Sequence, residues 1–464
     1  MRTEFFKGAS SRQNLGIESA PHLHGSMTTP KLMLLTSAAL LPVLGVYLYF
    51  YGFGVIWQLL IAGGTAFAAE LLTALLRRRW LKSALGDYSW LVYALILALT
   101  VPPLLPWYQT VFCTLFAILL VKEAFGGLGM NIFNPAMSGF VFLIISAPTA
   151  LSGSWITPAP AAITAAGPQA TMEVIFEGSS SGELYKSLRT LRTAAEDEYQ
   201  QKLAAVEAEI EAEASASPAA GTEAALNAND LPEARAATAA ATATAPAFPE
   251  ASGSSPDAPH AADALSGATT DGTSGASTDA TSGATDALSG ATWLYEAKIA
   301  RKADDGSIFT PPDYFSPAYQ VYLWTAGACL AGGILLICLH IIMARMVFCF
   351  FAAMLLFSWA GGYFRPEIFY QPAEQLLLGG TMLAGFFIIT DPVTNAGTAR
   401  GRICFAILCA FLIILLRAFG SYSDAVAFSV MLCNAAAPLI DVLTRRRTFG
   451  AKYEKGEPNE RKGS

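Results

Sequence analysis

Four near-copies of one short motif lie between residues 263 and 293, and each presents a hydroxyl group directly after a Gly-Ala pair. Small residues around such a hydroxyl let the chain enter the active site of a modifying enzyme, and an upstream aspartate offers a contact for that enzyme's metal or basic groups. The segment is therefore suited to covalent modification, although its composition by itself favours a low-complexity Ser/Gly/Ala linker. The copies have the form Asp-x-x-Ser-Gly-Ala-Thr, begin at Asp263, Asp271, Asp279 and Asp286, and end at Thr269, Ser277, Thr285 and Thr292.

The elements that hold this segment in place are long apolar stretches of the chain on either side of it. The 464-residue chain has a mean hydropathy of +0.44 and only 14% charged residues, which is too apolar for a soluble protein of this length. A helix needs about 20 apolar residues to cross a bilayer, so the pattern predicts an all-α polytopic membrane protein of about ten transmembrane helices. The candidate spans are 31–50, 53–76, 89–104, 107–121, 136–151, 319–340, 344–361, 374–390, 403–418 and 424–443.

The basic residues predict the orientation of these spans. Clusters at 77–79, at 400–402 and at 445–447 all fall on one side of the membrane if both termini are cytoplasmic, as the positive-inside rule requires. The segment 152–318 then lies outside. It contains most of the acidic residues, since residues 171–313 have a net charge of −15 and the remainder +8. The acidic balance thus describes one external loop and gives no indication of a nucleic-acid partner.

Five spans precede the external loop and five follow it, so the two sets must have opposite orientations. This arrangement allows two inverted five-helix repeats with a site near the bilayer midplane. Within the loop, 183–214 is rich in helix formers and predicts one long solvated helix, and the Ala/Thr/Pro-rich segment after it predicts a mostly disordered tether. The expected divisions are a cytoplasmic segment 1–30, a first bundle 31–151, a periplasmic loop 152–318, a second bundle 319–443 and a basic cytoplasmic tail 444–464.

The Ser-Gly-Ala-Thr motif resembles the flavinylation site of the NqrB/RnfD family, in which a flavin transferase joins FMN to the threonine hydroxyl through a phosphodiester. Three longer segments are similar to the same family, and the similarity covers about 31–195 and 286–450. They are GGLGMNIFNPAMSGFVFLIISAP at 126–148, GGTMLAGFFIITDPVTNAGTARGR at 379–402 and RAFGSYSDAVAFSVMLCNAAAPLID at 417–441.

The resemblance implies that Thr292 carries covalent FMN, because its motif leads directly into Trp293 and the return to the membrane. The insertion at about 196–285 and the extra motif copies depart from the family. They leave two interpretations, modification of Thr292 alone, which we favour, or further FMN groups on Thr269 and Thr285 that form a short external flavin wire. The acceptors are far enough apart along the chain that the flavins would meet only if this flexible segment folds back.

Several further residues are candidates for a site inside the membrane. The glycine-rich stretch 126–137 predicts non-helical backbone lining a cavity, and with the family resemblance Asn131 and Asn134 become candidate lining residues for an ion or a non-covalent flavin. Asp391 stands before a proline, where it would cap the following segment or contact an ion. Glu70 and Glu123 lie at depths where ionisable groups suggest function, although both are close enough to an interface to reach water.

The resemblance implies a subunit of an Rnf-type (also called Rsx) electron-transport complex, a translocase of the bacterial inner membrane that couples electron transfer to movement of Na⁺ or H⁺. The other subunits of the complex, a flavin transferase and membrane lipid are the expected partners. The alternatives are the B subunit of a Na⁺-pumping NADH:quinone reductase, or a non-redox transporter or channel of inverted-repeat type. No phosphate loop, dinucleotide fingerprint or zinc motif occurs, so we assign no catalytic or metal-binding residue and no complete substrate site.

Overall fold

The computed structural model describes residues 27–81, 85–156, 158–178, 182–216, 317, 319–366, 368–420 and 425–445. These residues are almost entirely helical. The chain divides into two units, of which the first comprises residues 1–201 and 281–464 and the second comprises 202–280. All the apolar helices belong to the first unit. Helix α10 (Gly182–Ala216) confirms the helix predicted over 183–214 and continues into the second unit.

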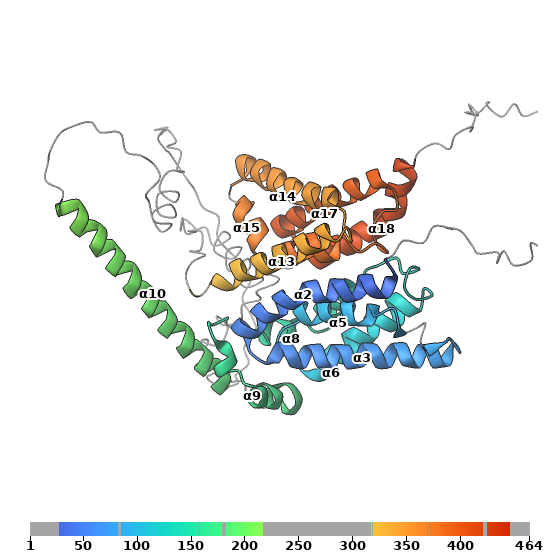
Figure 1. The fold of residues 1–464 in the computed structure, drawn as a ribbon, viewed down its shortest axis with the longest axis horizontal. Coiled ribbons are helices and arrows are strands. Elements are labelled where there is room, and N and C mark those ends of the chain that lie inside the picture. Colours follow the sequence, from blue (N-terminus) through green and yellow to red (C-terminus); the bar gives the residue numbers. More distant parts are fainter. Residues whose placement is uncertain are drawn as a thin grey trace, which may run out of the picture. The chain divides into compact units, whose positions relative to one another are not determined.

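The helices before the external loop form one bundle of the first unit (Figure 1). Helix α7 begins where its sequence favours a helix start, because the side chain of Asn134 accepts a hydrogen bond from the Met137 amide and Pro135 occupies the first turn. Helix α5 ends at Val101, directly before two prolines. The bundle consists of α2 (Thr29–Tyr51), α3 (Gly54–Leu76), α5 (Ser89–Thr100), α6 (Trp107–Leu115) continued by the π-helix η1 (Phe116–Glu123), and α7 (Pro135–Ser146), followed by the short elements α8 (Pro148–Gly153), η2 (Ala162–Thr164), α9 (Pro168–Met172) and η3 (Glu173–Glu177).

The helices after the external loop form a second bundle beside the first, drawn from yellow to red in Figure 1. Two long helices open it, an interrupted helix follows, and two long helices close it. The interruption falls at Leu378, Gly379 and Gly380, where Gly379 has a φ of +71° that glycine adopts readily. The elements are α13 (Gln320–Cys338), α14 (Ala344–Phe364), α15 (Pro372–Leu377), α16 (Thr381–Leu383) continued by η4 (Ala384–Ile388), α17 (Ala399–Phe419) and α18 (Val426–Thr444).

Six of these helices are long and apolar enough to cross a membrane, namely α2, α3, α13, α14, α17 and α18. They confirm six of the predicted spans to within a few residues. The other predicted spans correspond to shorter pieces, since α5 and α7 have 12 residues each and the stretch 374–390 is broken into α15, α16 and η4. The all-helical membrane fold is therefore confirmed, whereas the count of ten spans stays a prediction.

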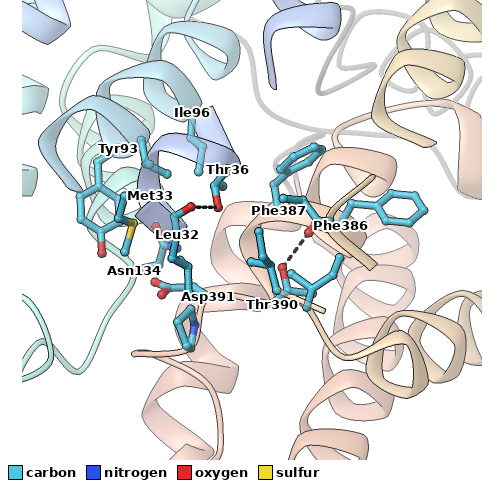
Figure 2. A pocket seen from close by; sticks show the side chains of 15 residues that line it. Leu32, Met33, Thr36, Tyr93, Ile96, Asn134, Phe386, Phe387, Thr390 and Asp391 are labelled. Atoms are coloured by element: carbon cyan, nitrogen blue, oxygen red, sulfur yellow. Dashed lines mark hydrogen bonds between the residues drawn. The ribbon is translucent and has the colours of Figure 1, made fainter. Parts of the chain in front are cut away.

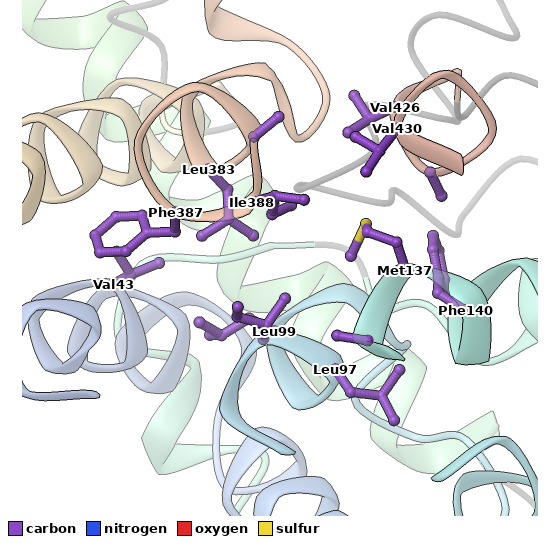
Figure 3. Packing of buried hydrophobic residues seen from close by; sticks show 14 of the residues in the cluster. Val43, Leu97, Leu99, Met137, Phe140, Leu383, Phe387, Ile388, Val426 and Val430 are labelled. Carbon is purple, nitrogen blue, oxygen red and sulfur yellow. The ribbon is translucent and has the colours of Figure 1, made fainter. Parts of the chain in front are cut away.

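The short elements provide much of the buried core between the bundles (Figure 3). Helix α5 is buried along its whole length after Trp90 and Leu91, and η4 is buried throughout. Because both are surrounded by other helices and do not face water, their sequences need no polar face and are continuously apolar. The core residues labelled in Figure 3 are Val43, Leu97, Leu99, Met137, Phe140, Leu383, Phe387, Ile388, Val426 and Val430.

The two bundles meet where α13 packs against α2. At this crossing the backbones come very close, because a Cβ atom added to Gly332 would collide with the carbonyl group of Ala39 and would press on the ring of Phe387. Small residues permit such close helix packing in membranes, where van der Waals contact replaces the hydrophobic effect. Gly332 therefore fixes the distance between the bundles.

Replacing Gly332 with valine is expected to destabilise the protein by about 1–3 kcal/mol or more, because helix α13 must move away from Ala39. The matched control is Gly327→Val on the same helix, since a Cβ added there meets no atom within 4 Å. The measurement is the midpoint of thermal unfolding of the purified protein. Equal midpoints for the two variants would show that the bundles are not held at this crossing.

Candidate functional site

A cavity of about 40 Å³ lies between the two bundles, toward one end of their helices. Figure 2 shows Met33 and Tyr93 of the first bundle on one side of it and Phe386 and Phe387 of the second on the other. The lining residues are Leu32, Met33, Thr36, Val92, Tyr93, Ile96, Asn134, Leu336, Ile341, Ile342, Phe386, Phe387, Thr390, Asp391 and Pro392.

The cavity wall is mostly apolar, with a small set of polar side chains. Two threonine hydroxyls donate to carbonyl groups of their own helices, Thr36 to Leu32 at 3.0 Å and Thr390 to Phe386 at 2.7 Å. Asp391 is held by the Val393 amide and the Thr394 hydroxyl at 3.1 and 3.3 Å. A buried apolar pocket with a few fixed polar groups suits a ligand that is itself largely apolar.

Asp391 caps a turn and does not cap the next helix. Its carboxylate bonds stay within residues 391–394, and α17 begins instead at Thr398, whose hydroxyl accepts a hydrogen bond from the Gly401 amide at 2.9 Å. The carboxylate also borders the cavity. Of the two roles that the sequence left open, capping of the local backbone is therefore present, and an ion contact stays a hypothesis.

The glycine-rich stretch before α7 is non-helical, as its sequence predicts. Gly126, Gly127 and Gly129 have φ values of +123°, +101° and +97°, which are strained for any residue with a Cβ. Asn131 holds this loop from within, since its side chain accepts from the Gly129 amide at 3.3 Å and donates to the Phe133 carbonyl at 3.1 Å. Asn134 is the residue of this stretch that borders the cavity.

A buried ionic cluster lies at the end of η1. The ammonium group of Lys122 pairs with the carboxylate of Glu70, donates to the Ser89 hydroxyl at 2.6 Å, and lies 3.8 Å from a carboxylate oxygen of Asp87. The side chains of Lys122 and Glu70 are 1% and 2% exposed. The sequence indicated that Glu70 lies close enough to an interface to reach water, and the structure instead gives it a partner inside the protein. A lysine at the end of an apolar run was the signal available for this pairing.

Glu123, the neighbour of Lys122, joins the glycine-rich loop to the end of α3. Its carboxylate lies 3.4 Å from Arg77 and 3.5 Å from Arg79. The same two arginines donate to the backbone carbonyl groups of Glu123 and Gly126 at 2.6 and 2.8 Å. The basic cluster that predicted the cytoplasmic side therefore also anchors the loop leading to Asn134.

The second bundle contains a buried arginine, which sequence reasoning missed. Arg417 is 3% exposed and donates to the carbonyl groups of Gln375 and Leu378 at 2.9 and 3.1 Å, to the Gln375 side chain at 2.8 Å and to the Thr381 hydroxyl at 2.9 Å. Carbonyl groups at the end of a helix lack partners within that helix, so this guanidinium satisfies the end of α15 and ties it to the start of α16.

The predicted flavin acceptors Thr269, Thr285 and Thr292 lie outside the described residues. Of the other predicted site residues, the structure brings Asn134 and Asp391 together at the cavity. It places Asn131 in the adjoining loop, and it places Glu70 and Glu123 in two separate ionic contacts with Lys122 and the arginines of 77–79. Among the described residues, no group of three or more His, Cys, Asp or Glu is arranged to hold a metal ion.

Comparison with known proteins gives a consistent result over nearly the whole chain. The pattern of the NQR2, RnfD, RnfE family matches residues 16–450. A protein of Cronobacter sakazakii, named as the D subunit of an ion-translocating oxidoreductase complex, is 32% identical over 94% of this chain and 98% of its own length. Proteins of the same name are 32% identical in Escherichia fergusonii, over 94% and 98% of the two chains, and 30% identical in Tolumonas auensis, over 94% and 99%.

Proposed function

The chain belongs to the NQR2, RnfD, RnfE family and is a membrane subunit of an ion-translocating oxidoreductase complex, and we propose that it carries FMN in phosphoester linkage on Thr292. The observation that carries this proposal is the motif Asp-Ala-Leu-Ser-Gly-Ala-Thr at 286–292, in a chain whose family match extends across it. A tethered flavin supplies the redox chemistry, and the protein supplies its position and electrostatic environment.

The cavity between the bundles is the proposed place for a second, non-covalent flavin. Its aromatic side chains Phe386 and Phe387 and its polar residues Asn134 and Asp391 suit a planar ligand that is apolar with polar edges, and the cavity of about 40 Å³ would have to widen to admit it. In this role the phenylalanines would pack against the ring system, and Asn134 and Asp391 would select its orientation. The bundles would thereby hold a redox group within the membrane domain.

The proposed topology has ten spans, with both termini cytoplasmic and the segment 152–318 periplasmic. The basic clusters support it, because the arginines of 77–79 and 400–402 stand at helix ends that this topology assigns to the cytoplasm. Exposed aromatic residues lie near both ends of the apolar helices, as expected of belts at the two membrane–water interfaces, and so support the membrane spans but not their direction.

We further propose that the bundles are inverted repeats of each other. Both consist of two long helices, a short or interrupted helix, and two more helices, in the same order. Lys122 and Arg417 support the correspondence, since each stands near the end of the fourth helix and bonds to the third, Lys122 to Ser89 at the start of α5 and Arg417 to Thr381 at the start of α16, after the interruption. The cavity nevertheless lies near the ends of α2 and α13 and not at their midpoints, where an inverted repeat would predict a site.

This subunit would then take part both in electron transfer through the membrane domain and in the movement of Na⁺ or H⁺. The bundles provide packed helices whose relative position a change of charge in the cavity could alter. Donor and acceptor substrates would be bound by the other subunits of the complex that the relatives' name implies.

Intact-mass measurement of the protein, purified from a host with an active flavin transferase, tests the covalent part of this proposal. One FMN adduct is expected, because the motif at Thr292 is the copy that leads directly into the return to the membrane. Two or three adducts would favour the flavin wire over a single carrier. A chain without any adduct would remove the covalent-flavin proposal.

A further inference from the structure

Asn434 lies on α18 in the second bundle and contacts residues of both bundles. Its side chain is 1% exposed. With the amide oriented by its hydrogen-bond partners, the nitrogen donates to the carbonyl groups of Thr394 and Val430 at 3.1 and 3.3 Å, and the oxygen accepts from the backbone amide of Asn134 at 2.9 Å. All the hydrogen-bonding groups of this buried side chain are therefore engaged.

Two of these contacts join loops from different bundles. The Asn134 amide ends the glycine-rich loop that begins at Gly126, and Thr394 belongs to the turn capped by Asp391. Both loops border the cavity, the first through Asn134 and the second through Asp391. The bond to Val430 is an ordinary contact within α18, so it fixes the amide and leaves the other two bonds to connect the loops.

The hydrogen bonds continue on either side of Asn434. On one side, Asn134 caps α7 and Asn131 holds the loop before it. On the other side, Thr394 donates to Asp391 at 3.3 Å. A polar network inside a protein acts as one unit when every member is satisfied, and in this network Asn434 is the member that touches both loops.

We propose that Asn434 is a positioning residue that sets the relation between Asn134 and Asp391, and through them the polar edge of the cavity. The ligand part of this inference rests on the proposed non-covalent flavin, whereas the bridge between the loops rests on the geometry alone. Removing the bridge would let the two loops move independently. Asn134 and Asp391 would then no longer hold the fixed relative position that orients a ligand.

Hydrogen–deuterium exchange in the purified complex tests the bridge. Asn434→Leu is expected to raise the exchange of backbone amides about fivefold in both loops, 126–134 and 390–398, as expected from the loss of one net hydrogen bond in each. Asn434→Ala, which removes the same bonds and adds no bulk, is measured in parallel. The matched control is Asn395→Leu, because the Asn395 side chain donates to Ile389 and Met346, both of the second bundle, and its loss should affect 390–398 alone.

Riboflavin binding to the same samples tests the positioning role. The dissociation constant should rise roughly threefold to thirtyfold in both Asn434 variants and rise by less in Asn395→Leu, which loosens one loop and keeps the bridge, while the fluorescence of covalent flavin stays constant in all. Faster exchange in only one loop would overturn the bridge, and faster exchange in both with unaltered riboflavin affinity would overturn the positioning role. Failure of the unaltered protein to bind riboflavin would instead count against the proposed ligand, and exchange would still decide the bridge.

Discussion

Replacing Thr292 with alanine is expected to abolish the flavin fluorescence of the denatured chain. A phosphoester needs the side-chain hydroxyl, and alanine removes that group while it keeps the small size that the surrounding motif requires. Only covalently attached flavin remains with the chain after denaturation, so ultraviolet illumination of the separated band measures the adduct directly. The expected change is from full signal to background.

The repeated motif provides matched controls for this experiment. Thr269→Ala and Thr285→Ala alter the same residue type in closely similar surroundings, and both should retain the full signal if Thr292 is the single acceptor. A signal that falls by a fraction in each of the three variants would indicate a flavin wire. Undiminished fluorescence in Thr292→Ala would refute the assignment of this residue.

Replacing Lys122 with methionine is expected to destabilise the protein by about 3–5 kcal/mol, the cost of leaving a buried charge without its partner. The change leaves the carboxylate of Glu70, which is 2% exposed, with no cation beside it, and it removes the donor that bonds to Ser89 at the start of α5. The measurement is the midpoint of thermal unfolding of the purified protein, with retention of covalent flavin as an independent check that the external segment is intact.

The double variant Glu70→Leu, Lys122→Met separates the cost of a lone charge from the value of the pair. Removing both charges together with apolar side chains of similar size should recover most of the stability, because buried ion pairs often contribute little over well-packed apolar residues. Recovery of stability without recovery of complex activity would assign the pair a role in function. A double variant as unstable as Lys122→Met would show that packing at these positions, and not charge, is what matters.

The apolar helices could be predicted from the sequence because their signal is local. The six long helices have the length and hydropathy that a bilayer requires. Prolines, glycines or basic clusters stand beside many of their ends. The interrupted stretch 374–390 was less predictable. Its hydropathy predicts one continuous span. The structure breaks this span at Gly379, where Arg417 contacts α15 and α16.

Some residues of the candidate site could also be identified from the sequence, and others could not. Asn134 could be identified because it stands in a glycine-rich family segment directly before a helix-starting proline. The partners of Lys122, Arg417 and Asn434 could not be identified, since they lie 33 to 52 residues away along the chain or in the other bundle. Such pairs follow from how helices pack, and one sequence contains no direct record of that packing.

The division of the chain into two units has a consequence for how proteins of this kind can diverge. The contacts that join the bundles lie within helices on either side of the external loop, and residues 202–280 form a unit of their own. We therefore expect that lengthening the chain between the bundles leaves their helix crossings unchanged. Duplicated acceptor motifs could then be added in this region without a change to the membrane domain, as a starting point for a carrier with more than one redox group.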